Sequence, residues 1–149
     1  MNLTNKMTIK FLSKSVNESF ARTVAGCFAL QLNPSVSEIS DIKTAVSEAV
    51  TNSIVHGYQN EIGEITMEGE IVGDTLHINI FDNGVGIEDV EQALEPFYTT
   101  KSQDERSGMG FTIMKSFMDE VKVKSKLNQG TQIYMTKKIM TDKEENAGK

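Results

Sequence analysis

Apolar and polar residues follow two periods along this chain, and their order predicts an α/β domain. Alternation with a period of two predicts strands at 8–13, 62–72, 75–81, 120–126 and 131–137. The turns Gly73-Asp74 and Asn128-Gln129-Gly130 join the last four strands into two hairpins. The first strand alternates weakly, so we expect it at an edge of the sheet.

Helical periodicity first appears after Ser15. The stretch Ser15-Val16-Asn17-Glu18 has the pattern of a capping box, and the helix that it begins is expected to run to about Leu32. Its predicted core-facing stripe is Val16, Phe20, Val24 and Cys27 or Phe28.

A second helix follows the break at Asn33-Pro34. Ser35 or Ser37 can cap it, and Gly57 ends it after about His56. Its predicted core positions are Ile39, Ile42, Val46, Ala49 and Val50.

Two further helices are expected in the second half of the chain. A short one spans Glu88 to Leu94 and stops at Pro96. The last begins near Phe111 and places four large apolar residues on one face: Phe111, Met114, Phe117 and Met118.

Length and charge narrow the class of protein. The 149 residues fit one domain, expected over 1–140, followed by a polar, disordered tail at 141–149. A formal net charge of −6 argues against general binding to nucleic acids. No run is apolar enough for a signal peptide or a membrane span, and the single Cys27 is expected in the core, so we expect a cytoplasmic protein.

The strand at 75–81 runs into Asp82-Asn83-Gly84-Val85-Gly86, the first of two glycine turns. A dinucleotide-binding turn would need a third glycine where Asp89 stands, and its phosphates would meet the like charge of Asp82. An acid at this place suits another task, which is to accept a hydrogen bond from the exocyclic amino group of a base such as adenine. The glycines would then make room for the ring.

The second glycine turn, Ser107-Gly108-Met109-Gly110, opens the last helix. The free N–H groups and the dipole at such a helix end favour phosphate. Residues 97–106 lie between the two turns, carry many hydroxyls and charges, and are predicted to form a mobile lid. Either turn alone is more typical of an ordinary tight turn than of a ligand site.

Glu48 and Asn52 lie four residues apart on the second helix, so their side chains project side by side. Such a pair can bind a hard cation through oxygen, and the carboxylate can take a proton from a hydroxyl. A solvated surface pair would be the preferred interpretation without the glycine turns. Arg22, away from the apolar stripe of the first helix, is either a solvated charge or a partner contact, and its surroundings alone favour the solvated charge.

The segments 48–52, 82–86 and 108–110 have the order and spacing of the N, G1 and G2 boxes of the GHKL ATPase/kinase superfamily. Over nearly its whole length the chain resembles the family of sporulation anti-sigma-F factors, which are serine-protein kinases. The strings that carry this resemblance are 17–22, 47–52, 56–58, 99–101 and 105–114.

The resemblance implies a Bergerat fold, a two-layer α/β sandwich with helices on one face of a mixed, mostly antiparallel sheet, and it implies a homodimer. It makes Glu48 the general base toward a substrate serine and places Arg106 near the γ-phosphate of ATP. Asn52 would hold Mg²⁺, Asp82 would meet the adenine, and Arg22 would contact protein partners. The residues implied to bind ATP or ADP are Asn52, Asp82, Gly84, Gly86, Thr99, Thr100, Lys101, Ser107, Gly108, Met109, Gly110 and Thr131.

The expected function joins inhibition of sigma F with ATP-dependent phosphorylation of a serine on an anti-anti-sigma protein. One alternative is a stress-response anti-sigma kinase with another sigma partner, and a second is a nucleotide-gated binding protein that transfers nothing. A sensor histidine kinase is not expected. His56 and His77 are the only histidines, and no residues remain for a separate phospho-accepting helical hairpin.

Overall fold

The fold was analysed in a computed structural model, which describes residues 3–95 and 109–140. The predictions for Thr99, Thr100, Lys101, Arg106, Ser107 and Gly108, for the lid at 97–106 and for the tail at 141–149 lie outside these residues.

Five strands form one sheet with the order β1-β2-β3-β5-β4, and every neighbouring pair is antiparallel. Its edge strands are β1, which begins earlier than predicted, and β4. The strands are β1 (Leu3–Leu12), β2 (Glu64–Val72), β3 (Thr75–Asp82), β4 (Glu120–Lys126) and β5 (Gly130–Lys138). The two predicted hairpins are confirmed, because β2 pairs with β3 across Gly73 and β4 pairs with β5 across 127–129.

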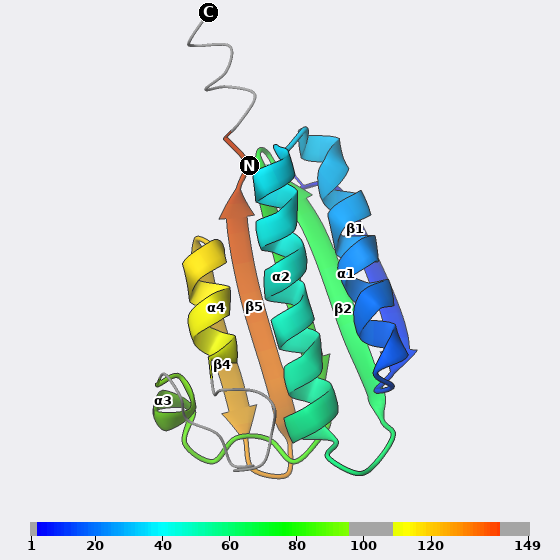
Figure 1. The fold of residues 1–149 in the computed structure, drawn as a ribbon, viewed down its shortest axis with the longest axis vertical. Coiled ribbons are helices and arrows are strands. Elements are labelled where there is room, and N and C mark those ends of the chain that lie inside the picture. The colour runs from blue at the N-terminus through cyan, green and yellow to red at the C-terminus, as the bar shows by residue number, and fades with distance from the viewer. Residues whose placement is uncertain (1–2, 96–108, 141–149) are drawn as a thin grey trace, which may run out of the picture.

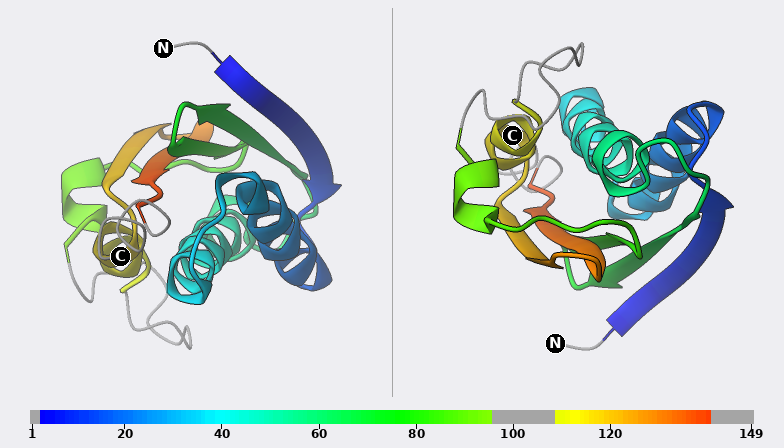
Figure 2. Two further views of the ribbon diagram at one scale, coloured as in Figure 1. Left: turned by 90° about the horizontal axis from the view of Figure 1, so that it is seen from above. Right: turned by 90° about the horizontal axis from the view of Figure 1, so that it is seen from below.

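The longer helices cover one face of this sheet, and the short helix α3 (Val90–Ala93) lies beside its β4 edge (Figures 1 and 2). The described helices are α1 (Val16–Ala29) with its 3₁₀ extension η1 (Leu30–Leu32), α2 (Val36–Asn52), the π-helical turn η2 (Ser53–Gly57), α3 (Val90–Ala93) and α4 (Gly110–Phe117). The predicted two-layer α/β fold is therefore confirmed. No helix in the described part of the chain is long and apolar enough to cross a membrane.

The core lies between α2 and the sheet. Four of the five predicted core residues of α2, namely Ile42, Val46, Ala49 and Val50, are fully buried. They share one hydrophobic core with alternate residues of β3, where Leu76, Ile78 and Ile80 are buried as well. Burying one such large side chain stabilises the fold by about 1.5–3 kcal/mol, so this layer fixes α2 firmly on the sheet.

The predicted stripe of α1 is confirmed only in part, because Val24 and Phe28 are partly buried against the core. Val16 and Phe20 are 73% and 49% exposed, and Cys27, predicted in the core, is exposed. The buried face carries small residues instead: Ala21, Ala25, Gly26 and Ala29. These small side chains allow α1 to pack closely against α2. Phe117 of α4 likewise lies at the surface, with 36% exposed, although its predicted partners Phe111, Met114 and Met118 are buried.

The predicted capping box at Ser15 is wrong, because the Ser15 side chain makes no cap hydrogen bond. Glu18 instead accepts hydrogen bonds from Ser47 Oγ on α2 and from Arg22 Nε. A complete capping box occurs at the start of α2. There Ser35 Oγ accepts from Glu38 N, and the Glu38 carboxylate accepts from Ser35 N, both at 3.0 Å.

Candidate functional site

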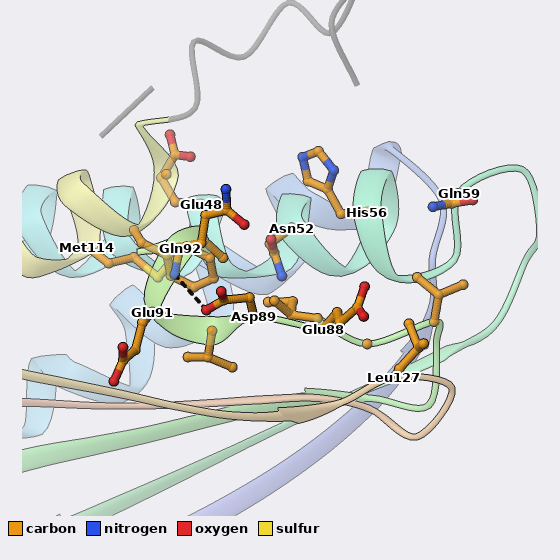
Figure 3. A pocket seen from close by; sticks show the side chains of 17 residues that line it. Glu48, Asn52, His56, Gln59, Glu88, Asp89, Glu91, Gln92, Met114 and Leu127 are labelled. Atoms are coloured by element: carbon orange, nitrogen blue, oxygen red, sulfur yellow. Dashed lines mark hydrogen bonds between the residues drawn. The ribbon is translucent and has the colours of Figure 1, made fainter. Parts of the chain in front are cut away.

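A cavity of about 920 Å³ opens between α2, α4 and the segment 85–93 (Figure 3). Its size lies in the range usual for small-molecule sites. The walls come from α2 and η2 (Glu48, Asn52, His56) with Gln59, from residues 85–93, from α4 (Gly110, Phe111, Met114) and from Leu127. Segments far apart in the sequence therefore meet in one concave site.

Glu48 and Asn52 both line this cavity from α2. The first residue of α4 lies beside them, since a Cβ built on Gly110 would stand 3.2 Å from Glu48 Oε2. The N-terminus of a helix offers N–H groups that have no partner within the helix, and such an end attracts anions. A carboxylate, a carboxamide and a helix N-terminus thus share one part of the cavity.

Four carboxylates line the cavity: Glu48, Glu88, Asp89 and Glu91. No lysine or arginine stands among the lining residues that the structure describes. Phosphate groups entering this acidic lining would meet like charges, so they require a cation or basic groups beside them. The predicted Lys101 and Arg106 belong to residues that are not described.

Asp82 ends β3 and is only 4% exposed. Its Oδ2 accepts a hydrogen bond from Ser53 Oγ at 2.6 Å, and its Oδ1 accepts one from Gly84 N at 2.9 Å. A Cβ on Gly57 would stand 3.1 Å from the carboxylate carbon and from both of its oxygens. These four residues form a compact group, the Asp82 cluster. Asp82 does not line the cavity itself, whereas Val85 and Gly86 just after it do.

The glycines of this turn serve chain packing, which the sequence did not predict. A Cβ on Gly84 would stand 2.1 Å from Gly57 O, and Val85 N donates to that same carbonyl at 2.8 Å. Gly86 has φ +75° and lies against Lys126 O, which a Cβ would approach to 2.0 Å. The turn is therefore pressed against backbone on both sides, and these contacts fix its shape.

Tyr58 links the glycine turn at 82–86 to β2. Its hydroxyl donates to Glu64 O at 2.6 Å and accepts from Asn83 N at 2.8 Å, which ties the start of β2 to the residue after Asp82. Burial raises the pKa of Tyr58, and the carboxylates of Asp82 and Glu64 add to this, while the hydrogen bond from Asn83 opposes it. Neither Tyr58 nor Ser53 was predicted as a site residue.

Thr131 is buried in β5 rather than exposed in the cavity. Its hydroxyl shares a hydrogen bond with Ser125 Oγ at 2.8 Å, and Ser125 Oγ also accepts from Ile87 N at 2.7 Å. Thr131 therefore lies beneath the segment that follows Gly86. Arg22 does not line the cavity either, and its Nε pairs with Glu18 Oε2 on α1 at 3.3 Å. Met109 precedes α4, where its carbonyl accepts from Ile113 N.

The cavity fits a magnesium ion that is held mainly by its ligand. No group of three or more His, Cys, Asp or Glu side chains in the described part of the chain could hold a metal. Mg²⁺ keeps several waters and needs only one or two protein oxygens beside substrate phosphates. Asn52 offers one such oxygen in the cavity, so the residues present are compatible with this ion.

Comparison with known proteins agrees with this geometry. Residues 13–137 match the family described as histidine kinase-like ATPase domain. An anti-sigma F factor of Thermoanaerobacter sp. (strain X514) is 57% identical over 143 residues, which cover 96% of this chain and all of that protein. An anti-sigma F factor of Clostridium acetobutylicum is 54% identical over 92% of this chain and 96% of its own.

Solved structures show the same fold at low identity. The RsbU and RsbW domains of Rv1364c from Mycobacterium tuberculosis align with a TM-score of 0.65 at 17% identity, over 91% of this chain and 32% of that one. The catalytic domain of histidine kinase ThkA aligns with a TM-score of 0.58 at 16% identity, over 89% and 96% of the two chains. Fold, cavity and sequence agree: the chain belongs to the histidine kinase-like ATPase domain family and, within it, to the anti-sigma F factors.

Proposed function

We propose that this chain is an ATP-dependent protein serine kinase that also acts as an anti-sigma factor. It binds and inhibits sigma F. It also phosphorylates a serine of an anti-anti-sigma protein, and this phosphorylation ends the association between the chain and the anti-anti-sigma protein. The family membership and the names of the relatives support the sigma partner. The observation that carries the kinase activity is the meeting of Glu48, Asn52 and the start of α4 in one cavity.

The chemistry follows from these positions. Asn52 would hold Mg²⁺, which supplies the positive charge that phosphates need beside the acidic lining. Glu48 accepts the proton of the substrate serine as the serine oxygen bonds to the γ-phosphorus, and the bond from that phosphorus to the bridging oxygen breaks. Phosphoserine and ADP leave. The free N–H groups at the start of α4 stabilise the phosphate charge, and positioning carries most of such a reaction.

The Asp82 cluster would recognise the base. A carboxylate has about four acceptor positions, and two of those on Asp82 are occupied by Ser53 and Gly84. The others remain for the 6-amino group of adenine. The predicted contacts of Thr99, Thr100, Lys101, Arg106, Ser107 and Gly108 with the phosphates complete this proposal.

The proposed partner surface includes Arg22. Its side chain is 39% exposed and pairs with Glu18, so an acidic residue of a partner would compete with that carboxylate. We propose further that the chain acts as a homodimer in the cytoplasm when it inhibits sigma F. It binds ADP as well as ATP.

The test is to incubate the purified chain with labelled ATP, Mg²⁺ and a candidate anti-anti-sigma protein, and to identify the labelled residue. We expect phosphoserine on that protein and none in a variant that lacks the serine. Binding of sigma F is measured in parallel with ATP and with ADP. Sigma binding without transfer would favour a nucleotide-gated binding protein, and selective binding of another sigma factor would favour a stress-response kinase.

A further inference from the structure

Ser53 is a buried hydroxyl to which neither the sequence nor the family match gives a role. It is 1% exposed and stands at the start of the π-helical turn η2, directly after Asn52. Its Oγ donates to Asp82 Oδ2 at 2.6 Å, although 29 residues separate the two. This is a short hydrogen bond to a carboxylate, the class of hydrogen bond that orients its acceptor most strongly.

The Asp82 carboxylate is fixed on three sides. Ser53 holds Oδ2, Gly84 N holds Oδ1, and the backbone of Gly57 lies against the face of the carboxylate. The Gly84 and Gly57 contacts come from the backbone and are present whatever side chain stands at 53. The Ser53 hydroxyl is thus the side-chain contact in this set that one substitution can remove.

We infer that Ser53 is a positioning residue that makes Asp82 selective for a purine with a 6-amino group. This inference rests on the proposed function, in which Asp82 recognises adenine. The hydroxyl points its proton at Oδ2, and this keeps the carboxylate in the orientation where its remaining acceptor positions meet an amino group. A 6-oxo purine would present an acceptor to these acceptors, and a site built for hydrogen bonding rejects a group that it cannot pair.

A structural role alone would give a different result. If Ser53 only satisfied a buried carboxylate, its loss would loosen the whole turn and weaken every nucleotide alike. If it positions Asp82, its loss weakens nucleotides in proportion to what they gain from the 6-amino group. Purine riboside triphosphate lacks only that group, so comparing it with ATP isolates the effect.

The experiment measures dissociation constants of ATP, purine riboside triphosphate and inosine triphosphate, with Mg²⁺, for the full chain. We expect the wild type to prefer ATP over purine riboside triphosphate by about tenfold or more. Ser53→Ala should reduce this preference about fivefold, mostly through weaker ATP binding, while the affinity for purine riboside triphosphate changes less than twofold. Preference for ATP over inosine triphosphate should fall in the same variant.

Two further variants separate the hydrogen bond from packing. Ser53→Cys keeps a side chain of the same shape, with a somewhat larger atom that donates weakly, so it should lose selectivity nearly as Ser53→Ala does. It also serves as the test if the alanine variant does not fold. Thr51→Val is the matched control, because it removes a buried hydroxyl that donates to Ser47 O on the same helix, and it should keep the wild-type preference.

The outcomes are distinguishable. A wild type without preference for ATP over purine riboside triphosphate would show that Asp82 does not recognise the amino group, and the proposed base recognition would fail with the inference. A wild type with this preference, kept in Ser53→Ala and Ser53→Cys, would overturn the role of Ser53 alone. Equal weakening of all three nucleotides would assign Ser53 a structural role and overturn the inference as well.

Discussion

The Asp82 cluster and the acidic lining of the cavity are built in opposite ways. In the cluster, a nearly buried carboxylate has donors on both oxygens, supplied by Ser53 and Gly84. In the lining, four carboxylates border one cavity, and no lysine or arginine stands among the lining residues that the structure describes. The first is prepared before any ligand arrives, while the second requires cations to receive phosphates.

The difference suggests a division of labour within the proposed site. A prepared carboxylate costs no reorganisation when a base binds, so it serves affinity and selectivity. An acidic lining that needs a cation makes the transfer depend on that cation and on correct positioning. Substitutions in the two regions should therefore separate binding from chemistry.

The largest effect is expected on the rate of phosphoryl transfer, at Glu48. Glu48→Gln keeps the shape of the side chain but cannot accept the serine proton, so the transfer rate should fall about 10²–10⁴-fold. ATP affinity and sigma binding should largely survive, since neither needs proton transfer. Single-turnover phosphorylation beside a sigma-binding assay measures both. A near-normal rate would exclude Glu48 as the base, and loss of ATP and sigma binding would indicate a structural or metal-organising role.

The sequence predicted most of the fold because hydrophobic periodicity reports burial locally. The stripe on α2 is buried nearly as predicted, since α2 lies on the sheet with α1 on one side of it and α4 on the other. The stripe on α1 was predicted only in part, because the close contact with α2 is made by Ala21, Ala25 and Ala29, whereas periodicity gives most weight to large residues such as Phe20. The hydrophobic periodicity of a helix does not indicate which neighbouring element the helix packs against.

Residue patterns alone predicted contacts in the candidate site only between residues that lie near one another in the sequence, and it was the family resemblance that joined the distant segments 48–52, 82–86 and 108–110. Glu48 and Asn52 are one helical turn apart, so their shared face follows from helix geometry. The Ser53–Asp82 hydrogen bond joins η2 to the end of β3, and it depends on a π-helical turn that no local pattern indicates. Tyr58 was missed for the same reason, because its two partners lie on β2 and in the glycine turn.

The second-largest effect is expected in the Asp82 cluster. Asp82→Asn should weaken ATP binding by about 1.5–3 kcal/mol, because a neutral amide replaces a charge-assisted acceptor. Nucleotide titration of the folded variant measures this, and circular dichroism checks the fold. Unchanged affinity would mean that Asp82 does not recognise the base.

Asn52→Ala tests the cation in the acidic cavity lining and should have a smaller effect on ATP binding. Losing one oxygen ligand should lower ATP affinity by about tenfold in Mg²⁺ and should make transfer need more Mg²⁺, since waters replace the amide only partly. ATP titrations at several Mg²⁺ concentrations, with and without EDTA, measure the dependence. If variant and wild type respond alike to Mg²⁺, Asn52 is not a ligand.

The smallest effect on ATP binding is expected at Tyr58, which supports the Asp82 cluster without belonging to it. Tyr58→Phe removes the donor to Glu64 O and the acceptor of Asn83 N–H, and it should lower the free energy of unfolding by about 1–2 kcal/mol at pH 7. Urea unfolding measures this loss. ATP affinity should fall only a few fold, since Ser53 and Gly84 still hold Asp82.

The same substitution should change how stability depends on pH. The pKa of Tyr58 is raised above 10.0 in the folded chain, mainly by burial, so the unfolded chain loses this proton first and stability falls as the pH rises through 10 and beyond. Tyr58→Phe should flatten part of that loss. The pKa of Tyr134 is also raised by burial, so Tyr134→Phe is the matched control. It should flatten the alkaline loss too but leave ATP affinity unchanged, and an alkaline loss unaltered in Tyr58→Phe would contradict the role of its hydroxyl.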